Sequence, residues 1–318
     1  MRQSRMALRS RGVIVAVALA GDILIALMKF GAAYATGSSA MSAEGIHSVM
    51  DAATEVALLY GIVAAHRPAT ALHQLGFGRE IFFWGFVAAL LIFAAGSGSA
   101  LHDGVSQIMN PQPIRDIKIS YCVLFVAFLV ELACTAYALN RVAGVKTWSG
   151  VVRFVRATRD TASLTILLGG LAGVMGLILA ATGIGLGVIL DQPSFDGFAS
   201  IGIAVILALT ASFLAAQGKS LLIGKSASAA KVNAIKEVAA AIVGVRSING
   251  AVTVQLSPDQ ILVALSVAFA PELLTSEIEN IVAAIDVAIK ADHPEITTFL
   301  VKPQSRQLYA KLSASRGW

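Results

Sequence analysis

Charged residues are scarce in this sequence, and motifs of enzyme active sites are absent. Asp, Glu, Lys and Arg make up only 14% of the 318 residues, whereas 57% are apolar, and the mean hydropathy is +0.77. These values are typical of an integral membrane protein, whose main partner is a lipid bilayer. The sequence contains no nucleophile elbow, phosphate-binding loop or HExxH motif, so it gives no support for an enzyme.

Cysteine is also nearly absent, and the basic residues form no aromatic-interleaved patch. Cys122 and Cys134 lie in one hydrophobic stretch, about three helical turns apart, which is too far for a disulfide within one helix. We expect both to be packing residues. The net charge of +5 indicates contact with an anionic membrane surface and not binding to nucleic acid.

Six hydrophobic stretches are long enough to cross a bilayer, which takes about 20 mostly apolar residues per helix. They cover residues 12–34, 40–65, 82–107, 117–140, 161–190 and 196–217. The first follows four arginines and could also be a cleaved signal peptide, but it is long and TGSSAMSAEG is a poor cleavage site. We therefore expect a domain of six transmembrane helices over residues 1–222.

Lysine and arginine gather on alternate connections between these stretches. They precede the first stretch and follow the second and the fourth, at Arg2, Arg5, Arg9, Arg11, Arg67, Arg79, Arg141, Lys146, Arg153, Arg156 and Arg159. Loops rich in these residues face the cytoplasm, so we expect both termini to be cytoplasmic. The N-terminal arginines favour a bacterial-type inner membrane.

Residues 223–303 have the pattern of a small soluble domain. Two runs rich in β-branched residues, SINGAVTVQL and QILVALSVAF, flank the turn Ser257-Pro258-Asp259, which is typical of a hairpin. The helical segments SASAAKVNAIKEVAAAIVGV and LTSEIENIVAAIDVAIK and the strand ITTFLVKP complete the domain. This order predicts an α+β sandwich in which helices cover one face of a three-stranded antiparallel or mixed sheet. We expect residues 304–318 to be a mobile tail.

Ionisable residues in the second stretch are the strongest functional signal. Spacings of three, four and four residues place four of them on one helix face, namely Glu44, His47, Asp51 and Glu55. Ionisable groups at membrane depth are rare unless they line a pathway or a site, and imidazole and carboxylate groups can converge on one cation. The stripe predicts a cation path through the membrane.

Several stretches together resemble the cation diffusion facilitator family of metal–proton antiporters. They are KFGAAYATGSSAMSAEGIHSVMDAATEVALLYG, HQLGFGREIFFWGFVAALLIF, KSLLIGKSAS and the helix–hairpin–helix–strand domain. The resemblance implies six membrane helices, a cytoplasmic ferredoxin-like dimerisation domain, a homodimer, and exchange of zinc or a similar divalent ion for protons. Manganese, iron and cobalt suit the same His and carboxylate ligands.

The resemblance also implies a metal site with two ligands on the second span and usually two on the fifth. His47 and Asp51 match the second-span pair. The fifth span reads Leu168-Gly169-Gly170-Leu171, where the most similar branch has Glu-Asp, and Ile166 stands where other members place a His or Asp. Half of the expected ligand set is therefore missing.

Two carboxylates occur where the resemblance implies amide side chains, at Asp22 in the first span and Glu55 in the second. We hypothesise that they replace part of the missing charge and move the cation site toward these two spans. In the alternative interpretation, Asp22 bonds a neighbouring helix as Asn would, and Gly169 and Gly170 allow close helix packing. The candidate metal ligands are Asp22, Glu44, His47, Asp51 and Glu55.

The remaining candidates are isolated. The resemblance makes His73 a candidate loop ligand, although a lone loop His is more often solvated. His293 is the only His of the soluble domain, so we expect dimerisation without metal there. Glu131 in the fourth span is a candidate proton or packing partner. The glycine at Gly170 also raises a second interpretation, a transport-deficient relative that acts as a regulatory or heteromeric partner subunit.

Overall fold

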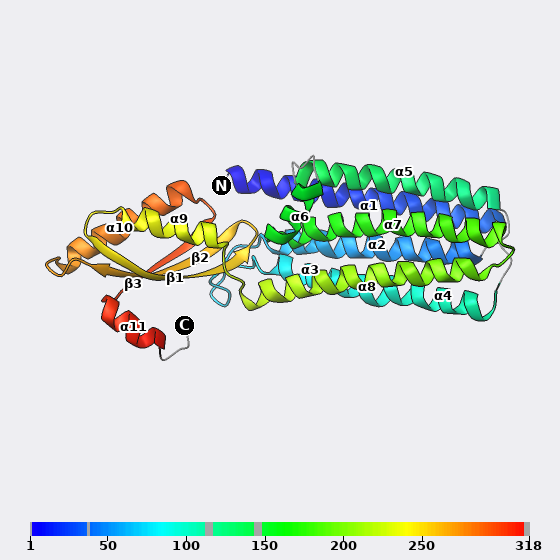
Figure 1. The fold of residues 1–318 in the computed structure, drawn as a ribbon. Helices are drawn as coiled ribbons and strands as arrows, with labels where there is room; N and C mark the ends of the chain where they lie inside the picture. Colours follow the sequence, from blue (N-terminus) through cyan, green and yellow to red (C-terminus); the bar gives the residue numbers. More distant parts are fainter. Residues whose placement is uncertain (1, 37–38, 112–116, 143–147, 315–318) are drawn as a thin grey trace. The chain divides into compact units, whose positions relative to one another are not determined.

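A computed structural model describes residues 2–36, 39–111, 117–142 and 148–314. It describes the backbone alone at residues 2–12, 14, 18, 32, 33, 35, 36, 39–47, 141, 142, 148 and 313. The chain divides into two compact units, residues 1–219 and 220–318. The first unit is a bundle of long helices, and the second combines helices with a small sheet (Figure 1).

The hydrophobic stretches of the sequence form long helices. The first unit contains α1 (Arg2–Thr36), α2 (Ser39–Ala64), α3 (Glu80–Leu91), the π-helix η1 (Ile92–Ser97), α4 (Gly98–Met109), α5 (Ile117–Val142), α6 (Trp148–Ala157), α7 (Thr161–Ile189) and α8 (Ser194–Ile223). Within the described residues, four segments are long and apolar enough to cross a membrane: 80–109, 117–140, 161–189 and 194–223. They coincide with the last four predicted spans. The first two predicted spans form helices α1 and α2, and their place in the membrane stays a prediction.

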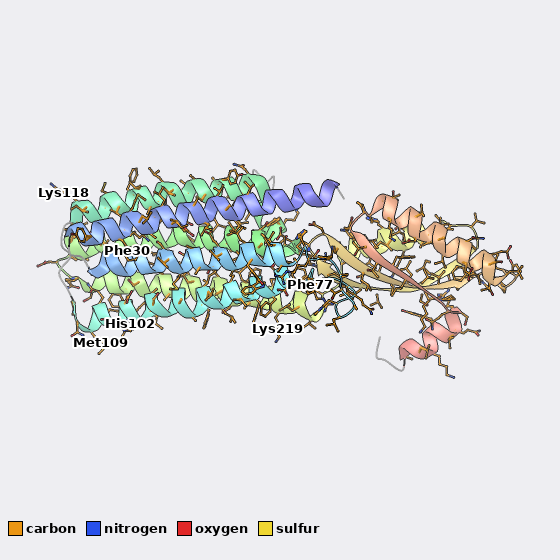
Figure 2. The ribbon with its side chains drawn as sticks, turned by 180° about the vertical axis from the view of Figure 1, so that it is seen from behind. Phe30, Phe77, His102, Met109, Lys118 and Lys219 are labelled. Carbon is orange, nitrogen blue, oxygen red and sulfur yellow. The ribbon has the colours of Figure 1, made fainter. Side chains whose placement is uncertain are left out.

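Basic segments gather at one end of the bundle. Phe30, His102, Met109 and Lys118 lie toward one end, and Phe77 and Lys219 toward the other (Figure 2). Helix α1 begins at the end where Phe77 lies, and α6, which carries Arg153 and Arg156, is at that end as well (Figure 1). This arrangement agrees with the predicted alternation of basic and non-basic connections.

Small residues bring the helices of the bundle close together. A Cβ atom added at Gly104 of α4 would lie 2.8 Å from the carbonyl oxygen of Gly197 in α8, so the two backbones nearly touch. A Cβ at Gly21 of α1 would lie 2.8 Å from Sγ of Cys134 in α5. Both cysteines are free thiols, and Cys134 has the predicted packing role, whereas Cys122 is exposed. Close approach at small residues is a common way for helices to associate in membranes.

From α9 to β3, the second unit has the element order that the sequence predicts, and an additional helix, α11, follows. It contains α9 (Ala229–Ala240), β1 (Val245–Ser257), β2 (Gln260–Phe269), α10 (Thr275–Asp292), β3 (Ile296–Pro303) and α11 (Arg306–Ala314). Strand β2 lies between β1, to which it is antiparallel, and β3, to which it is parallel, so the sheet is mixed. Ser257 pairs with Gln260 across the predicted turn. Whether the unit is ferredoxin-like stays a prediction.

One face of the sheet carries the core of this unit. Helices α9 and α10 lie on that face, and α11 lies on the other (Figure 1). Ile235 of α9 and Ile285 and Ile289 of α10 are fully buried against Val263 and Leu265 of β2. Alternate residues of a strand point to one face of its sheet, which explains why Val263 and Leu265 share this core.

Helix α11 occupies most of the segment for which the sequence predicts a mobile tail. The Ser305 hydroxyl accepts a hydrogen bond from the backbone N–H of Leu308, at 3.2 Å, and so caps the first turn. The Tyr309 hydroxyl lies against Gly250 of β1, where a Cβ atom would have no room. A capped first turn and an aromatic contact to the sheet account for a helix at this position.

Candidate cation site

A cavity of about 130 Å³ lies inside the helix bundle. Helices α1, α2, α5, α7 and α8 and the π-helix η1 all contribute to its wall. The ionisable side chains that line it are Asp22, Lys29, Asp51, Glu55, Glu131 and Cys134. The structure therefore brings together Asp22, Asp51 and Glu55 from the predicted ligands, and it adds Lys29 and Glu131 from the same bundle.

The two unusual acids of the sequence bond to each other. The carboxyl groups of Asp22 and Glu55 share a hydrogen bond between α1 and α2, which requires a proton on one of them. Asp22 thus does bond a neighbouring helix, as the alternative interpretation expects, but its partner is the second acid of the relocation hypothesis. The pairing is therefore compatible with a bond between helices and also with a relocated cation site, because a cation can exchange with a proton that two carboxyl groups share.

Several polar groups are buried in the wall of the cavity. The Lys29 side chain is 4% exposed and its Nζ donates a hydrogen bond to Ser48 Oγ at 3.0 Å. Glu55 is 5% exposed, and its Oε2 has no hydrogen-bond partner among the described residues. The same holds for the hydroxyl oxygens of Thr135 and Thr165. Buried oxygens of this kind are costly unless water or a cation fills the space beside them.

The acids around the cavity act on one another electrostatically. Asp22 interacts with Asp51 and Glu131, and also with the ammonium group of Lys29. Glu55 interacts with Asp22, Asp51 and Glu131. Carboxylates that line one low-dielectric cavity repel one another, and positive charge beside them relieves that repulsion.

The glycines of the fifth span have different surroundings. Gly169 lines the cavity, and a Cβ there would meet no atom within 4 Å. Gly170 and Gly173 face α5, where a Cβ would collide with Thr135 and approach Glu131, respectively. Close helix packing therefore explains Gly170 and Gly173, whereas Gly169 opens into free space.

Two predicted ligands fall outside the described side chains. Glu44 and His47 lie on α2, but the structure describes only their backbone. Among the side chains that are described, no three His, Cys, Asp or Glu residues are grouped closely enough to hold a metal ion. The ligand set predicted from the second span stays a prediction.

The two isolated histidines have ordinary surroundings. His73 is exposed on the loop before α3, and its ring packs on Phe77 with 4.6 Å between the centroids. In the second unit, Nδ1 of His293 lies 3.7 Å from Oε1 of Glu295, which also pairs with Lys231 at 2.6 Å. Burial alone would raise the pKa of Glu295, but the hydrogen bond from Lys231 and the nearby positive charges hold it below its usual value.

The chain is similar to a known protein domain and to several known proteins. The model of the cation efflux transmembrane domain matches residues 15–223. The human relative named proton-coupled zinc antiporter SLC30A9, mitochondrial, is 29% identical over 250 residues, which are 78% of this chain and 44% of the relative. Metal tolerance protein C4 of Arabidopsis thaliana is 29% identical over 214 residues, 67% of this chain and 47% of the relative.

A bacterial relative matches a shorter region. The cation-efflux pump FieF of Klebsiella pneumoniae is 30% identical over 156 residues, 48% of this chain and 49% of the relative. The matched part of the chain thus spans less than half the length of each of these three relatives. Since the domain model covers about two thirds of the sequence, the chain belongs to the cation diffusion facilitator family.

Proposed function

We propose that this protein exports divalent cations across a membrane in exchange for protons. One observation carries the proposal, namely the cavity inside the helix bundle that Asp22, Asp51, Glu55 and Glu131 line. Ionisable groups at membrane depth are a functional signal by default. The relatives named as a proton-coupled zinc antiporter and as a cation-efflux pump support the same activity.

The chemistry of the cavity explains how protons and cations compete. Carboxylates in a low-dielectric space need a positive partner, which is either a set of protons or a divalent ion. Entry of the ion displaces the protons, and their return expels the ion, so exchange follows from competition for the same oxygens. The proton shared by Asp22 and Glu55 is one that an entering ion would displace.

We propose zinc as the cargo, with its ligands drawn from the candidates Asp51, His47, Asp22, Glu55 and Glu44. Zinc is named for the human relative, and carboxylate and imidazole groups are among its usual ligands. Manganese, iron and cobalt accept the same groups. We infer no tightly bound cofactor.

We further propose the arrangement of the protein in its membrane. The basic connections favour six spans with both termini in the cytoplasm, in a bacterial-type inner membrane, although the human relative is named as mitochondrial. The second unit, residues 223–303 in the sequence analysis, is the proposed homodimerisation domain.

A second candidate function follows from the fifth span. Its two glycines supply no ligands, and the described side chains form no group that holds an ion. In this second candidate function, the chain is a transport-deficient member of the family that acts as a regulatory or heteromeric partner subunit.

Flux measurements distinguish the cation exporter from the transport-deficient partner subunit. The native chain and Asp51→Ala are reconstituted into proteoliposomes, and zinc uptake is followed under an imposed proton gradient, with Asp103→Ala as the control because Asp103 lies away from the cavity. Proton-driven flux that Asp51→Ala abolishes and Asp103→Ala preserves supports the exporter. A folded native protein without flux of zinc, manganese, iron or cobalt supports the partner subunit.

A further inference from the structure

The carboxyl group of Glu131 lies directly over the glycines of α7. A Cβ atom added at Gly173 would lie 3.0 Å from Oε1, 3.2 Å from Cδ and 3.4 Å from Cγ of Glu131. A Cβ at Gly170 would lie 3.4 Å from the same Oε1. The Glu131 side chain therefore runs along the glycine face of α7, in space that any larger residue would occupy.

Glu131 also belongs to the wall of the cavity. It lines the cavity together with Asp22, Asp51 and Glu55, and it interacts electrostatically with both Asp22 and Glu55. An acid that merely filled a gap between helices would gain nothing from the two carboxylates that act on it, because like charges oppose one another.

Buried oxygens in the same wall point to a ligand. Glu55 is only 5% exposed, and its Oε2 has no hydrogen-bond partner among the described residues. The hydroxyl of Thr135, which packs on Gly170, is buried in the same way. These oxygens come from α2 and α5, and a cation between them would satisfy both.

We infer that Glu131 supplies from the fourth span the carboxylate that the fifth span lacks. The divalent cation is then held by acids of α1, α2 and α5, while Gly170 and Gly173 of α7 make the room in which Glu131 lies. This inference rests on the proposed function, in which the cavity carries the cation. It replaces the fifth-span ligands of the family with a group from a different helix.

Zinc affinity of the full chain tests the inference. Competition with a chromogenic chelator is measured on purified protein for the native chain, Glu131→Gln and Gly173→Ala, with Gly98→Ala as the control because a Cβ at Gly98 meets no atom within 4 Å. Loss of a ligand costs at least as much as loss of an outer-shell partner, so we expect Glu131→Gln to bind zinc roughly 10- to 100-fold more weakly. Gly173→Ala weakens binding because it displaces Glu131, and Gly98→Ala binds as the native chain does.

A rescue variant separates ligation from packing. Position 169 opens into the cavity, so Gly169→Asp returns a carboxylate to the fifth span without a collision. We expect Gly169→Asp to restore zinc binding when it is combined with Glu131→Gln. A folded Glu131→Gln protein with native affinity, or a double variant with no recovery, overturns the inference. A native chain that binds neither zinc nor manganese contradicts the proposed function instead.

Discussion

Replacing Lys29 by Met removes a positive charge from the wall of the cavity. The Lys29 ammonium is buried, donates to Ser48 and acts electrostatically on Asp22. Met keeps an unbranched chain in the same space. We expect Lys29→Met to bind divalent cations more tightly than the native chain, because the ammonium and the cargo are drawn to the same acids.

The size of the effect follows from Coulomb's law. For a separation of about 7 Å and an effective dielectric constant of about 20, a single charge repels a divalent ion by roughly 5 kcal/mol. The acids also hold protons more tightly once the ammonium is gone, which offsets much of this gain. We therefore expect a net gain of about 1–3 kcal/mol, or about 5- to 150-fold in affinity.

Binding and transport respond in opposite directions. Tighter binding slows release, so zinc flux into proteoliposomes should show a lower KM together with a lower kcat. Lys29→Arg keeps the charge and should stay close to the native protein. Lys219→Met removes an exposed lysine outside the cavity and should change nothing. Unchanged or weaker zinc affinity in a folded Lys29→Met protein would refute this reasoning.

Three further predictions concern the acids, the helix packing and the second unit. Asp22→Asn and Glu55→Gln should each weaken zinc affinity, since each removes one member of the shared proton site; native affinity in both would end the relocation hypothesis. Gly104→Ala should lower the unfolding free energy in detergent by about 1–3 kcal/mol because α8 leaves no room, and stability equal to that of the native chain would contradict the packing. The pKa of Glu295 is lowered in the folded chain, so its ionised form stabilises the second unit above the unfolded pKa near 4.5, and this contribution disappears as the pH falls through the lower folded value. Hydrogen exchange of the β3 segment should show that loss in acid, and Glu295→Gln should remove that pH dependence.

The fold of the second unit could be predicted because its signals are local. Alternating apolar residues, the turn at Ser257-Pro258-Asp259 and the apolar spacing of α10 each lie within one segment. The helix predicted for the α9 segment extends too far at its C-terminal end, since α9 ends at Ala240 and Gly244 takes a positive φ of 93°. The sequence predicts no helix after β3, because the contact of Tyr309 with Gly250 joins distant residues.

The candidate site could be predicted only in part. The period of one helix places Asp51 and Glu55 together, and the departure from the family pattern identifies Asp22. The roles of Lys29 and Glu131 depend on how α1, α2, α5 and α7 pack, which no spacing within one segment reveals. The available signal was that each is a charged residue inside a hydrophobic stretch, Lys29 in the same stretch as Asp22 and Glu131 in the fourth.

Locating the bound ion tests the central claim most directly. Crystals of the full chain soaked with zinc would be measured at the zinc absorption edge, where anomalous scattering identifies the metal. The account predicts a peak in the cavity, within about 2.0–2.2 Å of a carboxylate oxygen of Asp51. Zinc bound only elsewhere, for example at His73 or His293, with none in the cavity of a transport-active protein, would contradict it.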